Sequence, residues 1–292
     1  MSPLKSTAVF WRRQLGRASV HFLVYGVLIL WTAITFFGFT WVVLTSLKSN
    51  RELFTINSIW GLPEVLQWEN YVRAWTHSKM GNFLLNSTLV SMTSVLLINL
   101  VGSMAAYILA RFRFAGNRLI LGAFILGSAI PLQLITVPLY LMFNDLGLLN
   151  SLVGLTMVYV AISLPFTVFV LTGFFKSIPT ALEEAAVLDG ASEYGVFWHV
   201  MLPLAAPGVI TVTIFNFLGV WNEYLLALML INETDKMTIP LGLYNLQVVQ
   251  EYAADFTGLF AGFVIMLLPT IVAFVFLQER ISRGMTVGAL KG

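Results

Sequence analysis

Long uncharged stretches alternate with short polar ones along the chain. Six stretches of at least 20 residues contain no Asp, Glu, Lys or Arg and are rich in Leu, Ile, Val and Phe. They are residues 22–47, 80–110, 119–144, 146–175, 200–222 and 256–278, and the fifth continues beyond Glu223 to Asn232. A membrane-spanning helix needs about 20 mostly apolar residues. The pattern therefore predicts an all-α, polytopic membrane protein with six transmembrane helices.

The first stretch could belong to a cleaved signal peptide or to a retained span. Its 26 uncharged residues exceed the roughly 7–15 apolar residues of a secretory signal. No small-residue cleavage site follows it. We therefore expect a first transmembrane helix that stays in the protein.

Lys and Arg residues divide unequally between the two sides of such a membrane protein. If the N-terminus is inside, eleven of them fall in inside segments and five in outside segments. Cytosolic loops carry the excess of Lys and Arg. We therefore expect both termini in the cytosol, together with the segment between the fourth and fifth spans.

This orientation gives the expected domain boundaries. They are a cytosolic N-terminus at 1–20, a first span at 21–47, an outer loop at 48–79, a core of five spans at 80–280 that includes a cytosolic loop at 176–206, and a cytosolic tail at 281–292. Prolines fall inside three of the spans, at positions 131, 138, 165 and 269. Proline kinks in membranes fit helices around a wet cavity and fit ordinary bends equally well.

The segment between the fourth and fifth spans is unusually acidic, with Glu183, Glu184, Asp189 and Glu193 close together. Thr180 is placed to be a helix N-cap, with Glu183 completing a capping box. A first short helix would end at Gly190, because glycine favours the turn after a helix. A second would run from 191 or 192 to 200, and Pro203 and Pro207 would separate it from span five. Ala185 and Ala186 leave the first helix open to close approach, and Glu184 offers a charge to a partner. The alternative is a solvated linker.

The spacing of residues in this segment resembles a sequence pattern of a known protein family. The pattern E-A-A, three residues, G, nine residues, then I/V-x-L-P occurs in the permease subunits of binding-protein-dependent ABC importers. Here it is matched by Glu184-Ala185-Ala186, Gly190 and Val200-Met201-Leu202-Pro203, with Asp189 beside the glycine. Further matches over roughly 70–292 are Asn70-Tyr71, Asn86-Ser87, Trp221-Asn222-Glu223-Tyr224 and the ending Arg283-Gly284-Met285-Thr286-Val287-Gly288-Ala289-Leu290-Lys291-Gly292. Together they resemble the MalG-like permeases of maltose-type sugar importers.

The resemblance implies a partner for the acidic segment. Glu184, Ala185, Ala186, Asp189, Gly190, Leu202 and Pro203 would form a coupling helix and its support, seated on an ATPase subunit. Gly288, Lys291 and Gly292 of the tail would also contact the ATPase, or would be a disordered end. The expected partners are a second, MalF-like permease, two MalK-like ATPase subunits and an extracytoplasmic solute-binding protein. The permease would be non-catalytic and hold no cofactor, since ATP and Mg²⁺ bind the ATPase. It would lie in a bacterial or archaeal inner membrane and move a sugar or oligosaccharide, or alternatively glycerol phosphate or another non-sugar solute.

One carboxylate, Glu223, lies well inside a predicted span. A charge at the bilayer centre costs about 2.5–3.5 kcal/mol on insertion scales, so it should face the bundle interior or a cavity. It could line the translocation path or the seam between subunits, or make a structural hydrogen bond. Asn222, Asn216 and Gln133 are weaker candidates for contacts with sugar hydroxyls.

Two other classes of membrane protein fit less well. An intramembrane enzyme needs a paired nucleophile and base, paired carboxylates or metal ligands at membrane depth. Cysteine is absent, Glu223 stands alone, and the three histidines fall at span ends or in loops. A self-contained secondary transporter usually shows internal repeats or several buried ionisable residues, and the sequence shows neither.

Overall fold

The computed structural model describes residues 4–55, 60–76, 79–253 and 255–289, and within these ranges every regular element is helical. The first half of the chain forms α1 (Leu4–Ser46), α2 (Asn50–Leu53), α3 (Glu69–Thr76), α4 (Met80–Arg111), α5 (Asn117–Ser128), α6 (Leu132–Asp145) and α7 (Leu152–Ser177). The second half forms α8 (Thr180–Leu188), α9 (Glu193–Val196), a π-helical turn η1 (Phe197–Met201), α10 (Leu202–Leu204), α11 (Ala206–Trp221), α12 (Leu225–Leu230), a 3₁₀ turn η2 (Thr234–Lys236), α13 (Ile239–Ala253) and α14 (Phe256–Ala289).

Helices α4, α7 and α11 form the centre of the molecule, and α4 against α7 is its most extensive helix contact. Small residues let their backbones approach closely, as is usual between membrane helices. A Cβ added to Gly102 on α4 would lie 2.7 Å from Thr167 Cγ2 on α7, and one added to Gly208 on α11 would lie 2.5 Å from the Phe174 ring on α7. Two polar bridges add to this packing, from Asn99 to Thr213 and from Asn216 to Thr167, each 2.8 Å long.

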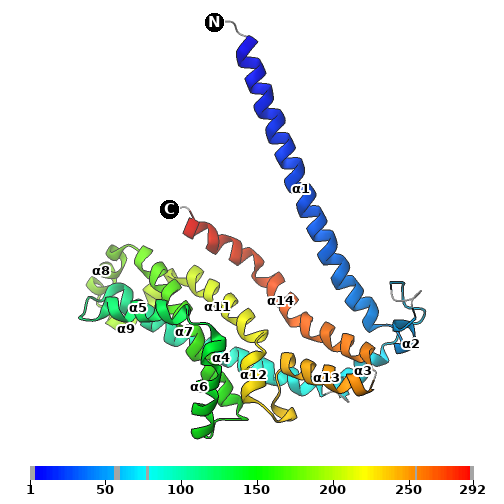
Figure 1. Cartoon of the computed structure of the whole chain (residues 1–292). Coiled ribbons are helices and arrows are strands. Elements are labelled where there is room, and N and C mark those ends of the chain that lie inside the picture. The colour runs from blue at the N-terminus through cyan, green and yellow to red at the C-terminus, as the bar shows by residue number, and fades with distance from the viewer. Residues whose placement is uncertain (1–3, 56–59, 77–78, 254, 290–292) are drawn as a thin grey trace.

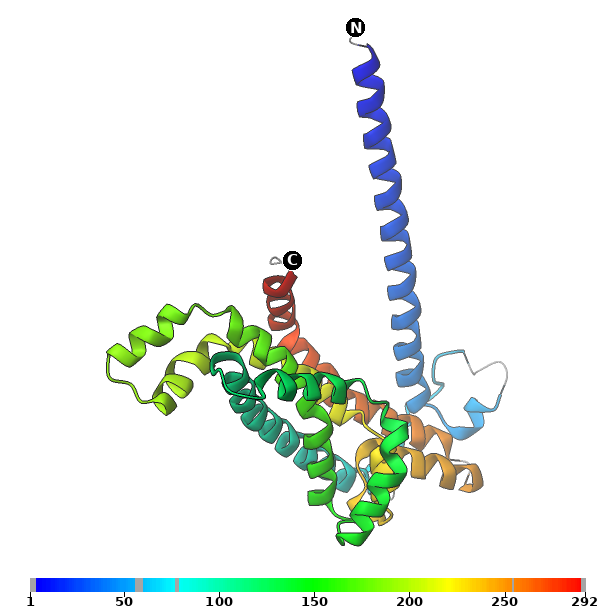
Figure 2. The same cartoon turned by 60° about the vertical axis from the view of Figure 1, so that its left-hand side comes forward.

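The apolar interior falls into two clusters at opposite ends of these helices. One surrounds Phe83, Tyr159 and Trp221 and reaches α12 and α13. The other surrounds Tyr107, Phe175 and Phe197, where α4 and α7 meet the segment from α8 to α10. We call residues 180–204 the knob, and the end of the molecule where they lie the knob end. In both views α14 runs back toward the knob end, whereas α1 extends away from the rest of the molecule (Figures 1 and 2).

In the described part of the chain, single helices of membrane-crossing length occur at three of the six uncharged stretches. Among the described residues, His21–Ser46 of α1, Met80–Arg111 and Leu152–Ser177 are each long and apolar enough to cross a membrane. Two further crossings would each need a bent pair, α5 with α6 at 101° and the helix Glu193–Leu204 with α11 at 73°. Phe256–Val272 of α14 is a shorter apolar segment. The all-α architecture agrees with the sequence prediction.

The third predicted span, 119–144, is broken rather than kinked. Helix α5 ends at Ser128, and Pro131 is the extended residue immediately before α6. Proline lacks an N–H and disfavours helical geometry in the residue before it, so it commonly stands at such a break. Pro138, Pro165 and Pro269 instead lie inside continuous helices. Four apparently equivalent prolines therefore have different effects.

Helix α1 stands apart from the rest of the molecule (Figures 1 and 2). None of the residues in its most hydrophobic window is buried. Its contacts with other elements gather near its C-terminal end, where Trp41 packs edge-on against Phe260 of α14 at 5.5 Å and lies 5.7 Å from Trp60. A long apolar helix left bare in this way needs lipid or another protein around it.

Candidate functional site

Helix α8 begins differently from the sequence prediction. Thr180 is the first helical residue rather than the N-cap, which is Pro179 and makes no side-chain cap bond. The Glu183 carboxylate therefore forms no capping box. Its Oε1 accepts a 2.6 Å hydrogen bond from the Tyr107 hydroxyl, and its Oε2 lies 3.1 Å from Arg111 Nε. A charged guanidinium and a phenol bind this carboxylate more strongly than a backbone N–H does. The predicted capping box was wrong for this reason.

Arg111 anchors the knob to the end of α4. It is 9% exposed and Glu183 is 21% exposed, so the pair is largely shielded from water. A second guanidinium nitrogen, Nη2, donates to the Ile178 carbonyl 2.7 Å away, just before α8. These contacts join the last residue of α4 to both the approach to α8 and its first turn. The start of α8 is therefore attached to the end of α4 by an ion pair and a hydrogen bond.

The turn after α8 has the predicted glycine geometry. Gly190 has a φ of +87°, a left-handed conformation that glycine adopts at little cost. Its N–H donates to the Val187 carbonyl, and the Ala191 N–H donates to the Ala186 carbonyl, each at 3.0 Å. This pair of bonds is a Schellman motif. The prediction that Gly190 ends the first helix is confirmed.

The second helix of the knob is longer than predicted. Ser192 caps it, accepting from the Gly195 N–H at 3.2 Å, and helical structure continues through η1 to Leu204. Pro203 therefore lies within the helix instead of ending it. The proline ring would crowd the carbonyl four residues earlier, at His199, and the wider π turn stands directly before it. Pro207 does lie in the first turn of α11, after the 73° bend.

The knob carries exposed apolar side chains, from α8 and from the second helix that begins with α9. Leu188 is 87% exposed and Tyr194 is 77% exposed, and Leu182, Val187 and Trp198 are also exposed. Most of the sequence-predicted contact residues face outward too, namely Glu184, Ala185, Asp189, Gly190 and Pro203. Ala186 and Leu202 are instead partly buried against the cluster around Tyr107. The knob thus presents an uncovered apolar face on a fixed support.

Glu223 lies at the break between α11 and α12. Its Oε1 accepts from the Leu226 N–H at 2.8 Å, and its Oε2 accepts from the Ala227 N–H at 3.2 Å and from the Tyr159 hydroxyl at 2.7 Å. A carboxylate in this position satisfies the free N–H groups at the start of α12. Its hydrogen bonds thus match the structural interpretation, while it also lines a cavity.

The other polar candidates near the path do not form one site. Asn216 is buried and lines the same cavity as Glu223, of about 250 Å³, together with Tyr159, Ser163, Phe166 and Phe215. Asn222 is exposed and donates to the Leu218 carbonyl of its own helix at 2.8 Å. Gln133 lines a separate cavity of about 370 Å³ between α6 and α12. Only Glu223 and Asn216 are therefore brought together.

The C-terminal tail is described only in part. The backbone of α14 remains helical to Ala289, which includes Gly288. Lys291 and Gly292 lie outside the described residues.

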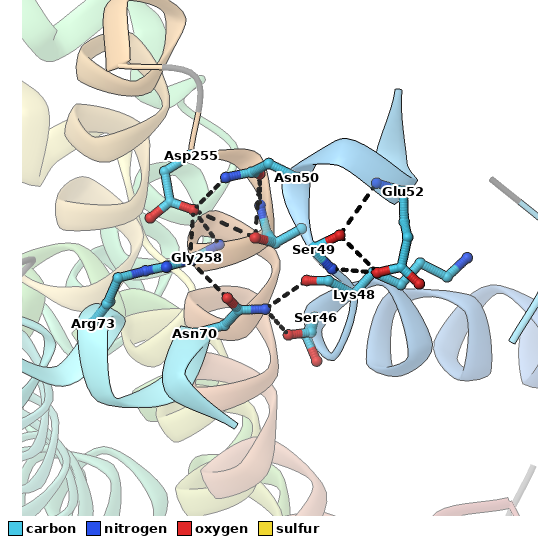
Figure 3. Close-up of polar contacts among 10 residues, drawn as sticks. Ser46, Lys48, Ser49, Asn50, Glu52, Asn70, Arg73, Asp255 and Gly258 are labelled. Atoms are coloured by element: carbon cyan, nitrogen blue, oxygen red, sulfur yellow. Dashed lines mark hydrogen bonds and ion pairs between the residues drawn. The ribbon is translucent and has the colours of Figure 1, made fainter. Parts of the chain in front are cut away.

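A polar cluster at the opposite end of the molecule was not predicted (Figure 3). We call it the clasp; its members are Ser46, Lys48, Ser49, Asn50, Glu52, Asn70, Arg73, Asp255, Thr257 and Gly258. Asn70 on α3 donates to the carbonyls of Ser46 and Lys48, each at 2.8 Å. Arg73 lies 3.2 Å from Asp255, which also accepts from Asn50 at 3.1 Å. The clasp joins the end of α1 and α3 to the start of α14.

A carboxylate inside the clasp has a perturbed pKa. Burial alone would raise the pKa of Glu52, but hydrogen bonds from the N–H groups of Glu64 and Ser49, the Ser49 hydroxyl and the Lys48 charge hold it below its usual value. The two N–H bonds are both 2.7 Å long. The charged form is thus part of the folded structure of this loop.

The pair Asn70-Tyr71, which matches the family pattern, was a sequence signal for the clasp. Asn70 is a buried member of the clasp that bonds three other members, and the Tyr71 hydroxyl lies 2.7 Å from Ser46 Oγ. The pair Asn86-Ser87 behaves similarly: Asn86 donates to two carbonyls at 235 and 237, and Ser87 accepts from the Ile239 N–H at 2.8 Å. Both pairs hold loops at the clasp end.

Known proteins resemble this chain over most of its length. Residues 98–287 match the family described as "Binding-protein-dependent transport system inner membrane component". The chain is 40% identical over 267 residues to the diacetylchitobiose uptake system permease protein NgcG of Streptomyces coelicolor, covering 91% of this chain and 88% of that one. It is 32% identical over 252 residues to the trehalose transport system permease protein SugB of Mycobacterium tuberculosis, covering 86% and 91%.

The fold is also found in a solved transporter. A chain in the crystal structure of a bacterial ABC transporter involved in the import of the acidic polysaccharide alginate superposes with a TM-score of 0.76 at 22% identity, covering 89% of this chain and 96% of that chain. The family match spans more than half of the chain and the relatives span nearly all of it. The chain therefore belongs to the inner membrane components of binding-protein-dependent transport systems, and is a multi-pass, non-catalytic permease subunit of an ABC importer.

Proposed function

We propose that the chain crosses the membrane six times, with both termini and the knob in the cytosol. Contacts at the helix ends support alternating directions: Arg111 of α4 meets Glu183 beside the end of α7, while the start of α7 meets the end of α12 through Asn150 and Leu230. The eleven-to-five distribution of Lys and Arg favours the knob end as the inner one. The domain boundaries are then those expected from sequence, with the core at 80–280 and its cytosolic loop at 176–206.

The knob is the coupling element in this proposal. Its exposed apolar side chains and small residues, Glu184 to Gly190 among them, would seat in an ATPase subunit. The ion pair between Arg111 and Glu183 supports this role, because α8 can transmit motion to the spans only if it stays attached to α4. ATP-driven closure of the ATPase would then move α8 and rock the spans attached to it. Gly288, Lys291 and Gly292 would add a second contact from the tail.

The assembly would contain a second, homologous permease of the MalF type, two MalK-like ATPase subunits and an extracytoplasmic binding protein. Support for the second permease comes from the bare surface of α1 and from the lack of an internal repeat in the sequence. A single copy of this fold offers half of a symmetric path.

The solute in this proposal is a neutral sugar or short oligosaccharide. The named relatives take up diacetylchitobiose and trehalose. The cavity beside Glu223 combines aromatic side chains with hydroxyl and amide groups, a lining that suits sugar faces and hydroxyls. The Glu223 carboxylate disfavours anions, so glycerol phosphate and other anionic solutes are the weaker alternative.

The observation that carries the proposal is the exposed apolar face of the knob, which is attached to α4 by the largely shielded ion pair of Arg111 and Glu183, in a chain of this family. The test is to reconstitute the importer with its binding protein and measure ATP hydrolysis with a panel of solutes. Neutral di- and oligosaccharides should stimulate hydrolysis, and phosphate-bearing solutes should not. Stimulation by an anionic solute alone would overturn the substrate assignment, and hydrolysis indifferent to the binding protein would overturn the coupling.

A further inference from the structure

A large cavity at the knob end is lined by three cations from separate elements. It measures about 960 Å³ and lies between the end of α4, the loop into α5 and the end of α7. Arg113 comes from the loop, Arg118 from the first turn of α5, and Lys176 from the last turn of α7. All three side chains are exposed. Positive charge is thus gathered where two long apolar helices end.

These cations lack acidic partners within the part of the chain that the structure describes. Arg73, Lys79, Arg111 and Lys236 each pair with a carboxylate. Arg113, Arg118 and Lys176 form no such pair among the described residues. The nearby carboxylate of Glu183 is already engaged by Arg111 and Tyr107. The cavity therefore holds uncompensated positive charge, which attracts an anion from outside the chain.

The loop that carries Arg113 is preshaped. Asn117 Nδ2 donates to the carbonyls of Leu109 at 3.2 Å and Phe112 at 2.8 Å, folding the loop back onto α4. Gly116, with a φ of +92°, precedes α5 without a side-chain cap, and the first turn of α5 contains no acidic residue. Hydrogen bonds from Asn117 therefore support the shape of the loop beside the three cations.

The wall of the cavity next to the charges is apolar. Leu119 is 78% exposed, Phe114 is also exposed, and Leu121 lies beside them. Solvent-exposed Leu and Phe beside unpaired Arg and Lys are suited to an amphiphile, with its phosphate on the cations and its acyl chain on the wall. Free phosphate would use only the first of these features. Basic pockets between membrane helices at the cytosolic face are suited to anionic lipid headgroups.

We propose that this cavity binds the phosphate of an anionic phospholipid headgroup at the cytosolic surface of the membrane. Arg113 and Arg118 supply planar donors for the phosphate oxygens, and Lys176 adds a point charge from α7. One lipid would then bridge the α4–α5 loop and the end of α7, close to the base of the knob. An acidic surface of a partner protein is the competing occupant.

The test compares lipid retention by the assembled importer containing the full-length chain. The complex is placed in nanodiscs of phosphatidylcholine with or without phosphatidylglycerol, extracted in detergent, and its bound lipid measured by native mass spectrometry. The variant R113Q/R118Q/K176Q should retain roughly a hundredfold less phosphatidylglycerol than the wild type, because each of the three cations contributes about fivefold to anionic-lipid affinity and these factors multiply. The charge-matched control R51Q/K79Q/K236Q, at the clasp end, should retain it fully. R113K/R118K keeps the charge but loses the planar donors, so its retention should lie between those of the wild type and the triple variant.

Several outcomes would overturn the proposal. One is equal phosphatidylglycerol retention in R113Q/R118Q/K176Q and the wild type. Another is displacement of the lipid by inorganic phosphate, which would identify a free-anion site. A third is loss of the ATPase subunits from the variant with lipid retention unchanged, which would identify a protein partner. If the triple variant fails to assemble, R113Q and R118Q alone should each lower retention several-fold, and unchanged retention in both would also count against the proposal.

Discussion

Glu183 and Gly190 hold the two ends of α8 by different means. Glu183 fixes the start through a shielded ion pair with Arg111, and Gly190 fixes the end through a left-handed turn that needs no Cβ. Spacing alone predicted the turn, because it depends on one residue and its immediate neighbours. The ion pair joins residues 72 positions apart in the sequence, and local patterns carry no signal for such a partner.

Replacing Glu183 with Gln should weaken the mount of α8. Arg111 would keep its bond to Ile178 but lose its counter-charge in a shielded site, so we expect a loss of about 1–3 kcal/mol in the stability of the knob. Binding-protein-stimulated ATP hydrolysis by the reconstituted importer should fall with it. Glu193→Gln is the matched control, since Glu193 is exposed on the same knob and pairs with no described cation. Equal effects of the two variants would contradict the role of the pair.

Replacing Gly190 tests the turn without introducing a clash. An added Cβ would meet nothing within 4 Å, so any effect arises from the φ of +87°. Valine in this conformation should cost more than about 1 kcal/mol and uncouple ATP hydrolysis from transport, while asparagine, which tolerates the left-handed region, should largely preserve both. Coupling that survives Gly190→Val would show that the turn is dispensable.

Substitutions of Glu223 distinguish a structural role from a role in the translocation path. Gln at this position keeps one acceptor oxygen, which can accept from the Ala227 N–H and the Tyr159 hydroxyl, and it loses only the bond from the Leu226 N–H, so Glu223→Gln should still assemble and transport almost as well as the wild type. Glu223→Ala leaves those donors unsatisfied and should lower the thermal stability of the complex. The measurement is solute uptake at matched complex abundance. A severe uptake loss in Glu223→Gln with normal assembly would assign the charge itself to transport.

At the scale of elements, the lengths of the uncharged apolar stretches predicted where the helices lie, but they did not predict where the helices bend or break. The stretches 80–110 and 146–175 became α4 and α7 because an uninterrupted apolar run has few alternatives in a membrane. The break at Pro131 and the continuity through Pro138 depend on what packs around each proline. Helix α13 was missed because it lies between the uncharged stretches that predicted the fifth and sixth spans, and its residues Ile239, Leu241 and Leu243 are buried only through tertiary contacts.

The clasp provides a pH test at the element scale. Because the pKa of Glu52 is held below its usual value, its charged form stabilises the folded loop above the ordinary value of about 4.3, and this stability is lost as pH falls through the lowered pKa. Acidification should therefore make the loop between α1 and α3 more sensitive to protease. Glu52→Gln should make the loop sensitive at neutral pH and remove most of the pH dependence. A loop whose protease sensitivity is the same at every pH would contradict the account.

In the whole molecule, polar contacts link separate elements at both ends. The clasp joins α1 and α3 to α14 at one end, and the ion-paired mount joins the knob to α4 at the other. Between them α1 remains bare, and the cavity beside Glu223 is only about 250 Å³. Sequence predicted the permease subunit and its coupling segment through spacing that extends across the chain. It could not predict which surfaces contact other subunits, since such contacts also depend on the sequences of those subunits.

The central claim is that α8 docks on an ATPase subunit, and site-specific crosslinking tests it most directly. The chain contains no cysteine, so Ala185→Cys introduces a single thiol on the exposed side of α8. With a short bismaleimide and cysteines placed in the ATPase surface, Ala185→Cys should crosslink to the ATPase in the assembled importer, and Leu146→Cys, exposed at the clasp end, should not. Absence of any ATPase crosslink from position 185, or an equal yield from position 146, would contradict the account.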